Sequence, residues 1–460
     1  MGVEAARDRT SRVSRFIAGS RHADWPEETL ELGRRHILDT LAATVVCRDL
    51  ETAVVAREFA LAQSGGIEGG TTILATRLRA SLTDAVFASA MTGHGAEIND
   101  FCPSAFVQPG PSIVSTALAL AERDHLPGAE VLRAVIAGYE LTCRIPKALG
   151  VAHGRALGIS SHGFGPVFGT AATAASLLRF DEAQVADVLS YCAQQASGSR
   201  QWLLDVGHIE KSFVFAGMPA RNGLHAALLV QAGFTGVPRA LDQAGGWFLS
   251  PLFAGGVDVQ PDYLVEELGT RFEMPLVAYK RYPVGGPTQP IVEAMLRLAS
   301  RVPAEDVRRV LIEMPGTPGA FASAEMPALS LPYLCSIILL DGRLDFDAAQ
   351  SHERMHRDAQ VHALMPLVEV RHDPAQEAEP RVESARVTLT RHDGTEEVEF
   401  VEHVRGFPAN PMTHEDVEAK ALELLVPKLG EARARRVVEL AWSIDRLPDA
   451  GVLVEAIAGD

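Results

Sequence analysis

The sequence predicts a mainly α-helical protein with a second, smaller α/β domain, and two observations carry this prediction. Residues 11–269 show helical periodicity and apolar segments of helix length, whereas strand-like segments first appear after residue 300. The chain has 460 residues, of which 47% are hydrophobic and 22% charged, enough for two or three globular domains. We therefore expect a large helical domain together with a smaller α/β domain.

Four segments before residue 180 predict helices. Glu28–Thr44 carries apolar side chains at spacings of three and four, and Pro26 stands just before it, which indicates an amphipathic helix. Ala85–Ala90, Ile113–Ala121 and Val167–Leu178 are rich in apolar residues and contain no charge. Helices that are apolar on every side are usually buried, so these segments predict a helical core with central helices.

The segments after residue 269 combine strands with helices. Pro287–Arg301 and Leu331–Leu340 are expected to be helical or buried. Asp393-Gly394, between the last two expected strands, is typical of a β-hairpin turn. The three strands are expected at Val307–Met314, Arg386–Thr390 and Val398–Val404.

Changes in composition place the domain boundaries. We expect the helical domain at residues 1–268 and 406–460, and the α/β domain at residues 269–405. A proline-rich segment at residues 407–411 interrupts the chain, and Thr413 followed by Asp416 predicts the capped start of a helix. The C-terminal helices are expected to return to the helical domain.

Charge and cysteine content exclude several classes of protein. The net charge of −17 argues against nucleic acid as a partner. No uncharged apolar run reaches about 18 residues, so no membrane span is expected. Residues 1–12 mix charges without an apolar core, so no signal peptide is expected. Five single cysteines without a C-x-x-C pair argue against a disulfide framework or a structural zinc site, and they favour a cytoplasmic location.

A polar stretch at residues 92–101 follows the apolar segment Ala85–Ala90. His94 and Glu97 stand three residues apart, so on a helix they would share one face. They could be a general base and its orienting partner, or a pair of metal ligands, although no third ligand follows at a matching spacing. A capped helix end with a satisfied, buried histidine explains the same residues, and the sequence leaves these alternatives open.

A second stretch, residues 158–166, places His162 among glycines just before the expected helix Val167–Leu178. As a tight loop before a helix, it could bring an anionic ligand close to backbone N–H groups. A turn that needs positive φ explains the glycines equally simply, and we favour that interpretation.

Two lysines stand in less ordinary surroundings. Lys211 precedes the small-residue run at residues 216–220, and Lys280 lies between aromatic and glycine residues at the entry to the α/β domain. Two lysines that converge from two domains would form a clamp for a carboxylate, and a partly buried lysine can also act as an acid or base.

Taken in order, these stretches resemble the MmgE/PrpD family, which includes 2-methylcitrate dehydratase, cis-aconitate decarboxylase and iminodisuccinate epimerase. The resemblance spans nearly the whole chain, and it depends on the shared order and spacing of the motifs. The motifs are His36–Ala42, Gly93-His94, Glu97-Ile98-Asn99-Asp100, Gly138-Tyr139-Glu140, Lys211, Arg221-Asn222-Gly223, Gly233-Phe234-Thr235-Gly236, Lys280-Arg281-Tyr282-Pro283, Leu339-Leu340-Asp341-Gly342 and Gly406–Thr413.

The resemblance implies a large helical domain with a smaller α/β lid, a homodimer, and an active site between the domains that needs no metal or organic cofactor. It implies a reaction at a carbon next to a carboxylate. Glu97 and Asp100 match the first and last acids of the family's Asp-rich loop. Lys211, Lys280 and Tyr139 match the family's two lysines and its Gly-Tyr-Glu tyrosine.

The chain also departs from the family pattern. Gln108 stands where the family usually has the histidine of His-Pro-Gly. Ser160 stands in the place of the Gly-Phe-His-Pro histidine, and a histidine follows only at His162. The expected Asp-Asp pair is Asn99-Asp100. A glutamine cannot accept a proton near neutral pH, so a plain dehydratase mechanism would lack one of its groups.

The leading hypothesis is a cofactor-independent enzyme that abstracts a proton α to a carboxylate of a small acid, a lyase similar to 2-methylcitrate dehydratase. Alternatives are an epimerase or isomerase of the same family, and a binding protein with a degenerate site. The expected catalytic residues are Lys280, Lys211, His94, Tyr139 and His162. The expected substrate-binding residues are Glu97, Asp100, Gln108, Ser160, Arg200 and Arg221.

Overall fold

The computed structural model describes residues 8–65, 69–377 and 383–459. The chain divides into two compact units. The helical unit holds the residues up to Gly95, Asn99–Val277 and the residues from Thr413 onward, and the α/β unit holds Ala96–Ile98 and Ala278–Met412. The expected fold class, a large helical part with a smaller α/β part, is confirmed.

The two units change over at residues 277/278 and 412/413, a few residues later than the expected domain boundaries. The short segment Ala96–Ile98, which belongs to the α/β unit, was not anticipated. Compactness alone does not establish which parts fold on their own, so the domain boundaries stay a prediction. The expected lack of a signal peptide concerns residues 1–12, of which 1–7 lie outside the described residues.

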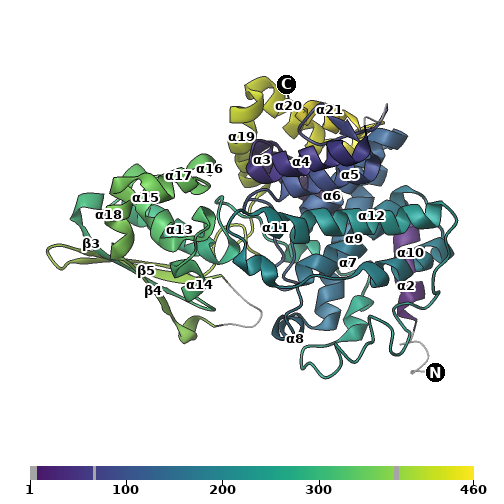
Figure 1. Ribbon diagram of the computed structural model, residues 1–460, viewed down its shortest axis with the longest axis horizontal. Helices are drawn as coiled ribbons and strands as arrows, with labels where there is room; N and C mark the ends of the chain where they lie inside the picture. Colours follow the sequence, from purple (N-terminus) through teal and green to yellow (C-terminus); the bar gives the residue numbers. More distant parts are fainter. Residues whose placement is uncertain (1–7, 66–68, 378–382, 460) are drawn as a thin grey trace. The chain divides into compact units, whose positions relative to one another are not determined.

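The helical unit is built almost entirely from α-helices (Figure 1). They are α2 (Arg9–Ser20), α3 (Glu27–Cys47), α4 (Glu51–Ser64), α5 (Leu82–Gly93), α6 (Gly110–Asp124), α7 (Gly128–Leu149), α8 (Val151–Ala156), α9 (Ser161–Leu177), α10 (Glu182–Gln195), α11 (Ile209–Ser212), α12 (Met218–Gln231), α19 (His414–Leu429), α20 (Glu431–Trp442) and α21 (Val452–Ile457). The shorter elements are the strands β1 (Thr71–Thr72) and β2 (Arg79–Ala80), the π-helical turn η2 (Phe213–Gly217), and the 3-10 turns η1 (Gln201–Leu204), η3 (Pro261–Leu264), η4 (Met274–Leu276) and η10 (Ile444–Arg446).

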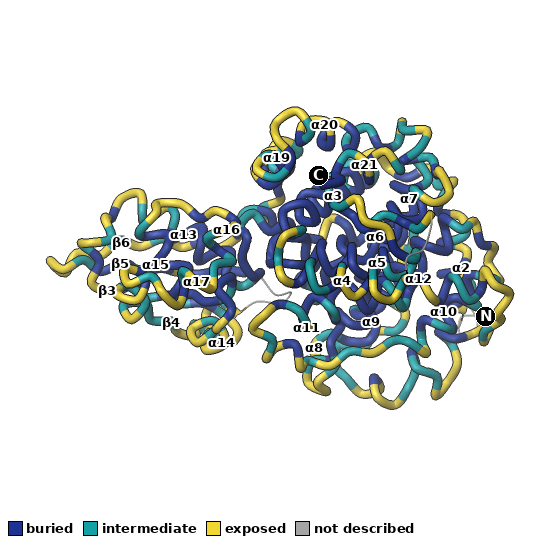
Figure 2. Tube along the Cα trace, turned by 45° about the horizontal axis from the view of Figure 1, so that its top comes forward, coloured by how far each residue is buried: buried dark blue, intermediate teal, exposed yellow. Residues whose placement is uncertain are grey.

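Helices α7 and α9 pack along each other in the core of this unit. Every residue of α9 is buried, and Figure 2 shows buried backbone running through α6 and α9. A Cβ on Gly138 would lie 2.2 Å from Thr173 Oγ1. A Cβ on Gly169 would lie 1.8 Å from Thr142 Oγ1. Glycine at both positions therefore allows the two helices to approach closely.

The four helices expected before residue 180 are confirmed. Glu28–Thr44 lies within α3, Ala85–Ala90 within α5 and Ile113–Ala121 within α6. Val167–Leu178 forms the second part of α9 and its C-cap. Each segment was predicted from apolar periodicity or an apolar run of helix length, and each packs into the core as that pattern requires.

A loop was predicted at residues 158–166. This prediction is wrong from Ser161 onward, because α9 begins there. A Cβ on Gly163 would lie 2.3 Å from the Ser197 carbonyl oxygen. Glycine at position 163 therefore allows α9 to pack closely against the neighbouring chain. Only Gly158, before the helix, has the positive φ that was expected, at 77°.

Helical structure was expected to continue to residue 269, but α12 ends at Gln231 and no α-helix follows among the described residues until Gln289. Glycine and proline recur in this stretch and favour turns. Arg144 on α7 holds it in place, because its guanidinium donates hydrogen bonds to the carbonyls of Tyr263, Glu266 and Arg271 at 2.6–3.0 Å.

The α/β unit contains a four-stranded mixed sheet in the order β4-β3-β5-β6. Strands β3 and β4 run parallel, and the other two pairs are antiparallel. The register pairs Val310 with Val368 and with Leu389. The strands are β3 (Val307–Met314), β4 (Val368–His372), β5 (Ala385–Arg391) and β6 (Glu396–Val401).

Helices α13 and α15 pack on this sheet. A parallel pair such as β3 and β4 needs a long crossover connection, and most of the helices of this unit lie in it. The helices are α13 (Gln289–Ala299), α14 (Gly319–Ala322), α15 (Leu331–Asp341), α16 (Phe346–Ala349), α17 (His352–Arg357) and α18 (Ala359–Leu364). The 3-10 turns are η5 (Gly286–Thr288), η6 (Ala304–Asp306), η7 (Pro327–Leu329), η8 (Met365–Leu367) and η9 (Pro374–Gln376).

Three expected strands are present, and the helices expected at Pro287–Arg301 and Leu331–Leu340 correspond to α13 and α15. The hairpin is confirmed, since β5 and β6 pair antiparallel and Gly394 has φ 89°. The last strand ends at Val401 rather than at Val404. Strand β4 was missed.

The capped helix start at Thr413 is confirmed. The Thr413 side chain accepts a hydrogen bond from the Asp416 backbone, and Asp416 accepts one from the Thr413 backbone in return. The resulting helix, α19, packs against α3, so the C-terminal segment returns to the helical unit as expected.

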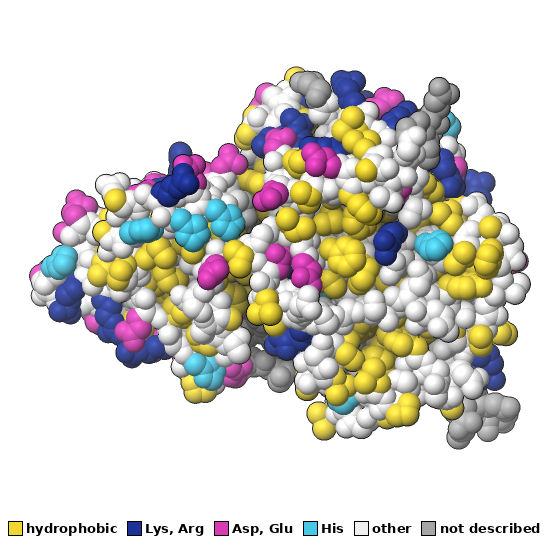
Figure 3. All heavy atoms as spheres, viewed as in Figure 1, with side chains coloured by type: hydrophobic (Ala, Val, Ile, Leu, Met, Phe, Trp, Pro, Cys, Tyr) yellow, Lys and Arg dark blue, Asp and Glu magenta, His cyan; other side chains and the backbone are white. Residues whose placement is uncertain are grey.

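The state of the cysteines, the apolar length of the helices and the surface charges can be compared with the predictions from composition. The five cysteines are buried free thiols. Among the described residues, no helix combines the length and the apolar composition that a membrane crossing requires. Figure 3 shows Lys and Arg side chains interspersed with Asp and Glu over the visible face. The expectations of a cytoplasmic location and of no nucleic-acid partner stay predictions.

Candidate functional site

Lys211 stands at the start of an irregular helix in the helical unit. The Asp205 carboxylate accepts a hydrogen bond of 2.8 Å from the Lys211 backbone N–H, which fixes the first turn. The chain then widens into the π-helical turn η2 before it continues as α12. Such π-turns are rare and frequently mark functional sites. This one contains Phe215, whose ring centre lies 5.5 Å from the Lys211 ammonium.

The Phe215 ring lies between two histidines that are far apart in the sequence. His162, from the first turn of α9, stacks on Phe215 with ring centroids 3.6 Å apart and planes 9° apart. His94 stacks on it with centroids 5.1 Å apart and planes 15° apart. Both histidines are buried. Two of the expected catalytic residues are therefore held in fixed orientations around one aromatic ring.

Trp202 and Phe106 complete this group, which we call the Phe215 cluster (His94, Phe106, His162, Trp202, Lys211 and Phe215). The His162 ring lies 4.8 Å from the Phe106 centroid and 5.6 Å from the Trp202 centroid. Trp202 Nε1 donates a hydrogen bond of 3.1 Å to the Ser160 hydroxyl, which fixes the indole and brings a fourth expected site residue to the cluster, after His94, His162 and Lys211.

Lys211 supplies a buried positive charge to the Phe215 cluster. Its ammonium lies 5.5 Å from the centre of the Phe215 ring and 5.6 Å from that of the Trp202 ring, and the residue is only 6% exposed. Aromatic faces attract a cation within about 6 Å. A cation in this setting is suited to bind an organic anion.

A second polar group surrounds Asp100, which is fully buried. The Tyr139 hydroxyl donates a hydrogen bond of 2.6 Å to Asp100 Oδ2, and His36 Nδ1 lies 3.1 Å from the same oxygen. Asp100 Oδ1 accepts a hydrogen bond of 3.0 Å from the Gly110 backbone N–H. Asp100 is thus held by groups from α3, α6 and α7, and Tyr139 is oriented by it rather than directed toward solvent.

Asn99 connects the two groups. Its Oδ1 lies 2.7 Å from His94 Nδ1, and its Nδ2 donates a hydrogen bond of 3.0 Å to the Asp100 carbonyl. The amide therefore orients the His94 ring. The asparagine that departs from the family's Asp-Asp pair thus has a defined structural role.

Asp39 and Lys420 form a buried ion pair next to this group. Lys420 Nζ on α19 lies 2.6 Å from Asp39 Oδ1 on α3, and both residues are at most 2% exposed. Burial raises the pKa of Asp39, and Lys420 offsets part of this rise. The pair fastens the C-terminal segment to the core of the helical unit.

Of the alternatives that the sequence left open for His94 and Glu97, a shared helix face is not observed. Helix α5 ends at Gly93, and His94 is its C-cap with φ −111°. Gly93 and Gly95 flank the histidine and weaken the helix at this point. His94 does fit the capped helix end that was the simpler alternative, since it is buried and hydrogen-bonded to Asn99.

In the α/β unit, Lys280 and Glu97 form a second buried ion pair. Lys280 Nζ lies 2.7 Å from Glu97 Oε2, and the residues are 0% and 2% exposed. The Tyr279 N–H donates a hydrogen bond of 2.9 Å to the Gly406 carbonyl, which anchors the segment before Lys280.

Three further residues were expected to bind the substrate, namely Gln108, Arg200 and Arg221. Arg200 donates a hydrogen bond of 3.4 Å to the Arg155 carbonyl, and half-buried Arg221 lies on α12 beside Asn222. Gln108 is buried, and its Oε1 has no hydrogen-bond partner among the described residues. Their roles in binding stay predictions.

Sequence reasoning missed the aromatic members of the Phe215 cluster and the Asp39–Lys420 pair. One signal was available, since Phe213 and Phe215 follow Lys211 closely in the sequence. Within the helical unit, the His94 and His208 rings lie 4.9 Å apart, so two side chains of a type that binds metals are close together. The expected independence from metals stays a prediction.

These observations describe a helical unit in which a buried lysine and two oriented histidines contact the same phenylalanine ring, and an α/β unit with a buried lysine. The model of the MmgE/PrpD N-terminal domain matches residues 11–259, and the model of the MmgE/PrpD C-terminal domain matches residues 282–445. The chain therefore belongs to the MmgE/PrpD family, and the resemblance seen in its motifs is confirmed.

Several curated proteins are similar to the chain over most of its length. Cis-aconitate decarboxylase of Aspergillus terreus strain NIH 2624 is 26% identical, with 75% of this chain and 74% of that protein covered. Cis-aconitate decarboxylase-like protein oryM of Aspergillus oryzae is 22% identical, with 98% and 97% covered. Human cis-aconitate decarboxylase is 21% identical, with 98% and 94% covered.

Proposed function

We propose that this protein is a lyase that acts on a small carboxylic acid by moving a proton at the carbon next to a carboxylate. Its family membership and relatives named as decarboxylases support the reaction class. The observation that carries the proposal is the Phe215 cluster, in which the Lys211 ammonium lies 5.5 Å from the centre of the ring on which His162 stacks.

In this proposal, Lys211 binds the substrate carboxylate. Lys211 is a buried residue, and charge-assisted hydrogen bonds to a carboxylate are roughly twice as strong as neutral ones. Phe215 and Trp202 provide the apolar surroundings that keep competing water away from this cation. A substrate whose carboxylate binds Lys211 would have its α-carbon near the other side chains of the Phe215 cluster.

His162 is the proposed proton-transfer group. Stacking on Phe215 fixes the plane of its ring, so only a substrate atom in a limited set of directions can approach a ring nitrogen. Histidine is the side chain that most often transfers protons near neutral pH. His94, oriented by Asn99, and Tyr139, oriented by Asp100, are proposed as positioning residues.

Lys280 is proposed as a cation or proton donor rather than as the base. Its ammonium forms an ion pair with Glu97, so a base function would first require the proton to move to that carboxylate. As a donor, Lys280 could supply a proton to a leaving hydroxyl or to the carbon that loses carbon dioxide. Binding roles for Gln108, Ser160 and Arg200, and the homodimer, stay predictions.

The test is turnover of a panel of carboxylic acids in D₂O, followed by proton and carbon NMR. Cis-aconitate, 2-methylcitrate and citrate are the first substrates, and loss of water, loss of carbon dioxide and α-proton exchange give different spectra. We expect His162→Gln to lower turnover by about 100-fold or more. His225→Gln, an exposed histidine on α12, serves as the matched control and should change little.

Three outcomes decide between the hypotheses. Turnover that depends on His162 supports the lyase. Proton exchange without net loss of water or carbon dioxide would favour the epimerase or isomerase. Tight binding of acids without turnover or exchange across the panel would contradict the proposal and favour the binding protein.

A further inference from the structure

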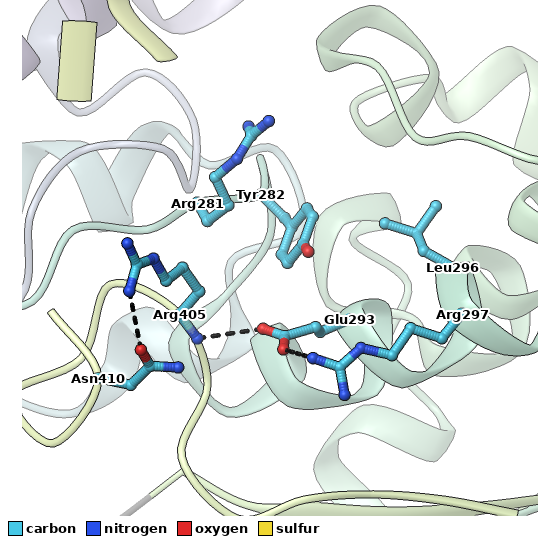
Figure 4. A pocket seen from close by; sticks show the side chains of 7 residues that line it. All are labelled: Arg281, Tyr282, Glu293, Leu296, Arg297, Arg405 and Asn410. Atoms are coloured by element: carbon cyan, nitrogen blue, oxygen red, sulfur yellow. Dashed lines mark hydrogen bonds and ion pairs between the residues drawn. The ribbon is translucent and has the colours of Figure 1, made fainter. Parts of the chain in front are cut away.

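A surface hollow of about 560 Å³ lies in the α/β unit, and the residues that line it all come from this unit. Figure 4 shows that three of its side chains come from α13 and two from the loop after β6. Pockets of about 300–1,000 Å³ typically hold small molecules. The lining residues are Arg281, Tyr282, Glu293, Leu296, Arg297, Arg405 and Asn410.

The hollow gathers positive charge on a chain whose net charge is −17. Three arginines, Arg281, Arg297 and Arg405, and one acidic residue, Glu293, line the hollow. Glu293 is itself engaged, because its Oε1 pairs with Arg297 and its Oε2 accepts a hydrogen bond of 3.1 Å from the Arg405 backbone N–H. The lining therefore has an excess of positive charge.

Neighbouring groups hold the charged side chains in place. Arg405 Nη1 donates a hydrogen bond of 2.9 Å to Asn410 Oδ1, and Figure 4 shows these two side chains together on one side of the hollow. Arg297 also lies 3.6 Å from Glu399, outside the lining. Side chains fixed in this way lose less conformational entropy when a ligand binds.

Tyr282 and Leu296 give the hollow an apolar part. The Arg281 guanidinium lies 5.7 Å from the centre of the Tyr282 ring. The Gln289 side chain fixes this segment by donating hydrogen bonds of 2.8 Å to the carbonyls of Tyr282 and Val284. The site thus combines cations with a carbon-rich wall, which suits an organic anion better than an inorganic ion.

We propose that this hollow binds a small organic anion that carries at least two carboxylate or phosphate groups, in addition to the substrate site at Lys211. Guanidinium groups match both kinds of oxyanion through paired N–H donors. Two such groups on one ligand would engage two of the three arginines, while the carbon skeleton contacts Tyr282 and Leu296.

The test is isothermal titration of the full-length Lys211→Met variant, so that the proposed substrate site contributes no binding. Citrate and fructose 1,6-bisphosphate are the two probes, which separate a carboxylate from a phosphate ligand, and glycerol is the uncharged control. We expect one equivalent of at least one anion to bind, with affinity that falls as salt is added, and no binding of glycerol.

Variants then locate the site. Arg297→Met and Arg405→Met should each weaken binding by about tenfold. Arg301→Met is the matched control, since Arg301 pairs with the same Glu399, at 2.6 Å, but does not line the hollow. Circular dichroism checks folding, and Asn410→Ala replaces any arginine variant that unfolds. Absence of binding for both anions, or equal weakening by Arg301→Met, would overturn the proposal.

Discussion

Replacing Lys211 by methionine is expected to lower kcat/KM for the carboxylic acid substrate by about 100- to 1,000-fold. Methionine keeps a long apolar side chain against Phe215 and Trp202, but it removes the positive charge of Lys211 from the cluster. The substrate carboxylate would then enter apolar surroundings without a cation to replace its water. Steady-state kinetics with the acid identified in the substrate panel measure the effect.

Lys428→Met is the matched control for this variant. Lys428 also belongs to the helical unit, but its side chain is 24% exposed and pairs with Asp49 at the surface. It should retain wild-type kinetics. Lys211→Arg should recover part of the activity, since it restores charge with a different geometry. Near wild-type activity in Lys211→Met would show that another group binds the carboxylate.

Replacing Lys420 by methionine is expected to lower the free energy of unfolding of the helical unit by about 3–5 kcal/mol. The variant leaves Asp39 fully buried without its ammonium partner, close to the carboxylate of Asp100. Urea unfolding followed by tryptophan fluorescence measures this loss, because all four tryptophans belong to the helical unit. They are Trp25, Trp202, Trp247 and Trp442.

Two comparisons identify the buried charge as the cause. Lys428→Met removes a surface pair from the same helix, α19, and should cost less than about 1 kcal/mol. Asp39→Asn combined with Lys420→Met removes both charges and should recover most of the loss. A double variant that is less stable than Lys420→Met alone would contradict this account.

The effect of Lys420→Met should also depend on pH. Burial raises the pKa of Asp39, and loss of Lys420 removes an interaction that lowers it. A carboxyl group whose pKa is higher in the folded than in the unfolded protein destabilises the fold as pH rises above the unfolded value, about 4. The stability difference from the wild type should therefore be smaller near pH 4.5 than at pH 7.

Most of the helices could be predicted because their apolar patterns match the way they pack. Strand β3 was equally clear, since its inward residues Val310, Ile312 and Met314 alternate with less buried ones. Strand β4 was missed because it is a half-exposed strand at the sheet edge, and its Glu369 and Arg371 interrupt any apolar run. The start of α9 was missed because Gly163 and Pro166 usually indicate a turn, whereas here tertiary packing overrides that preference.

The candidate site could be predicted only in part. Lys211, His162 and Lys280 stood out as polar residues within apolar or glycine-rich stretches. Their partners Phe106, Trp202 and Phe215 come from separate elements and share no local pattern. Asp39 and Lys420 are 381 residues apart, so only the folded chain brings them together.

The proposed mechanism depends on Lys211 as the group that binds the substrate carboxylate. A crystal structure of His162→Gln with the substrate bound tests this most directly, because the slowed reaction preserves the substrate. We expect a carboxylate oxygen about 2.8 Å from Lys211 Nζ, with the reacting carbon facing position 162. A substrate whose carboxylates all lie out of hydrogen-bonding reach of Lys211 would contradict the mechanism.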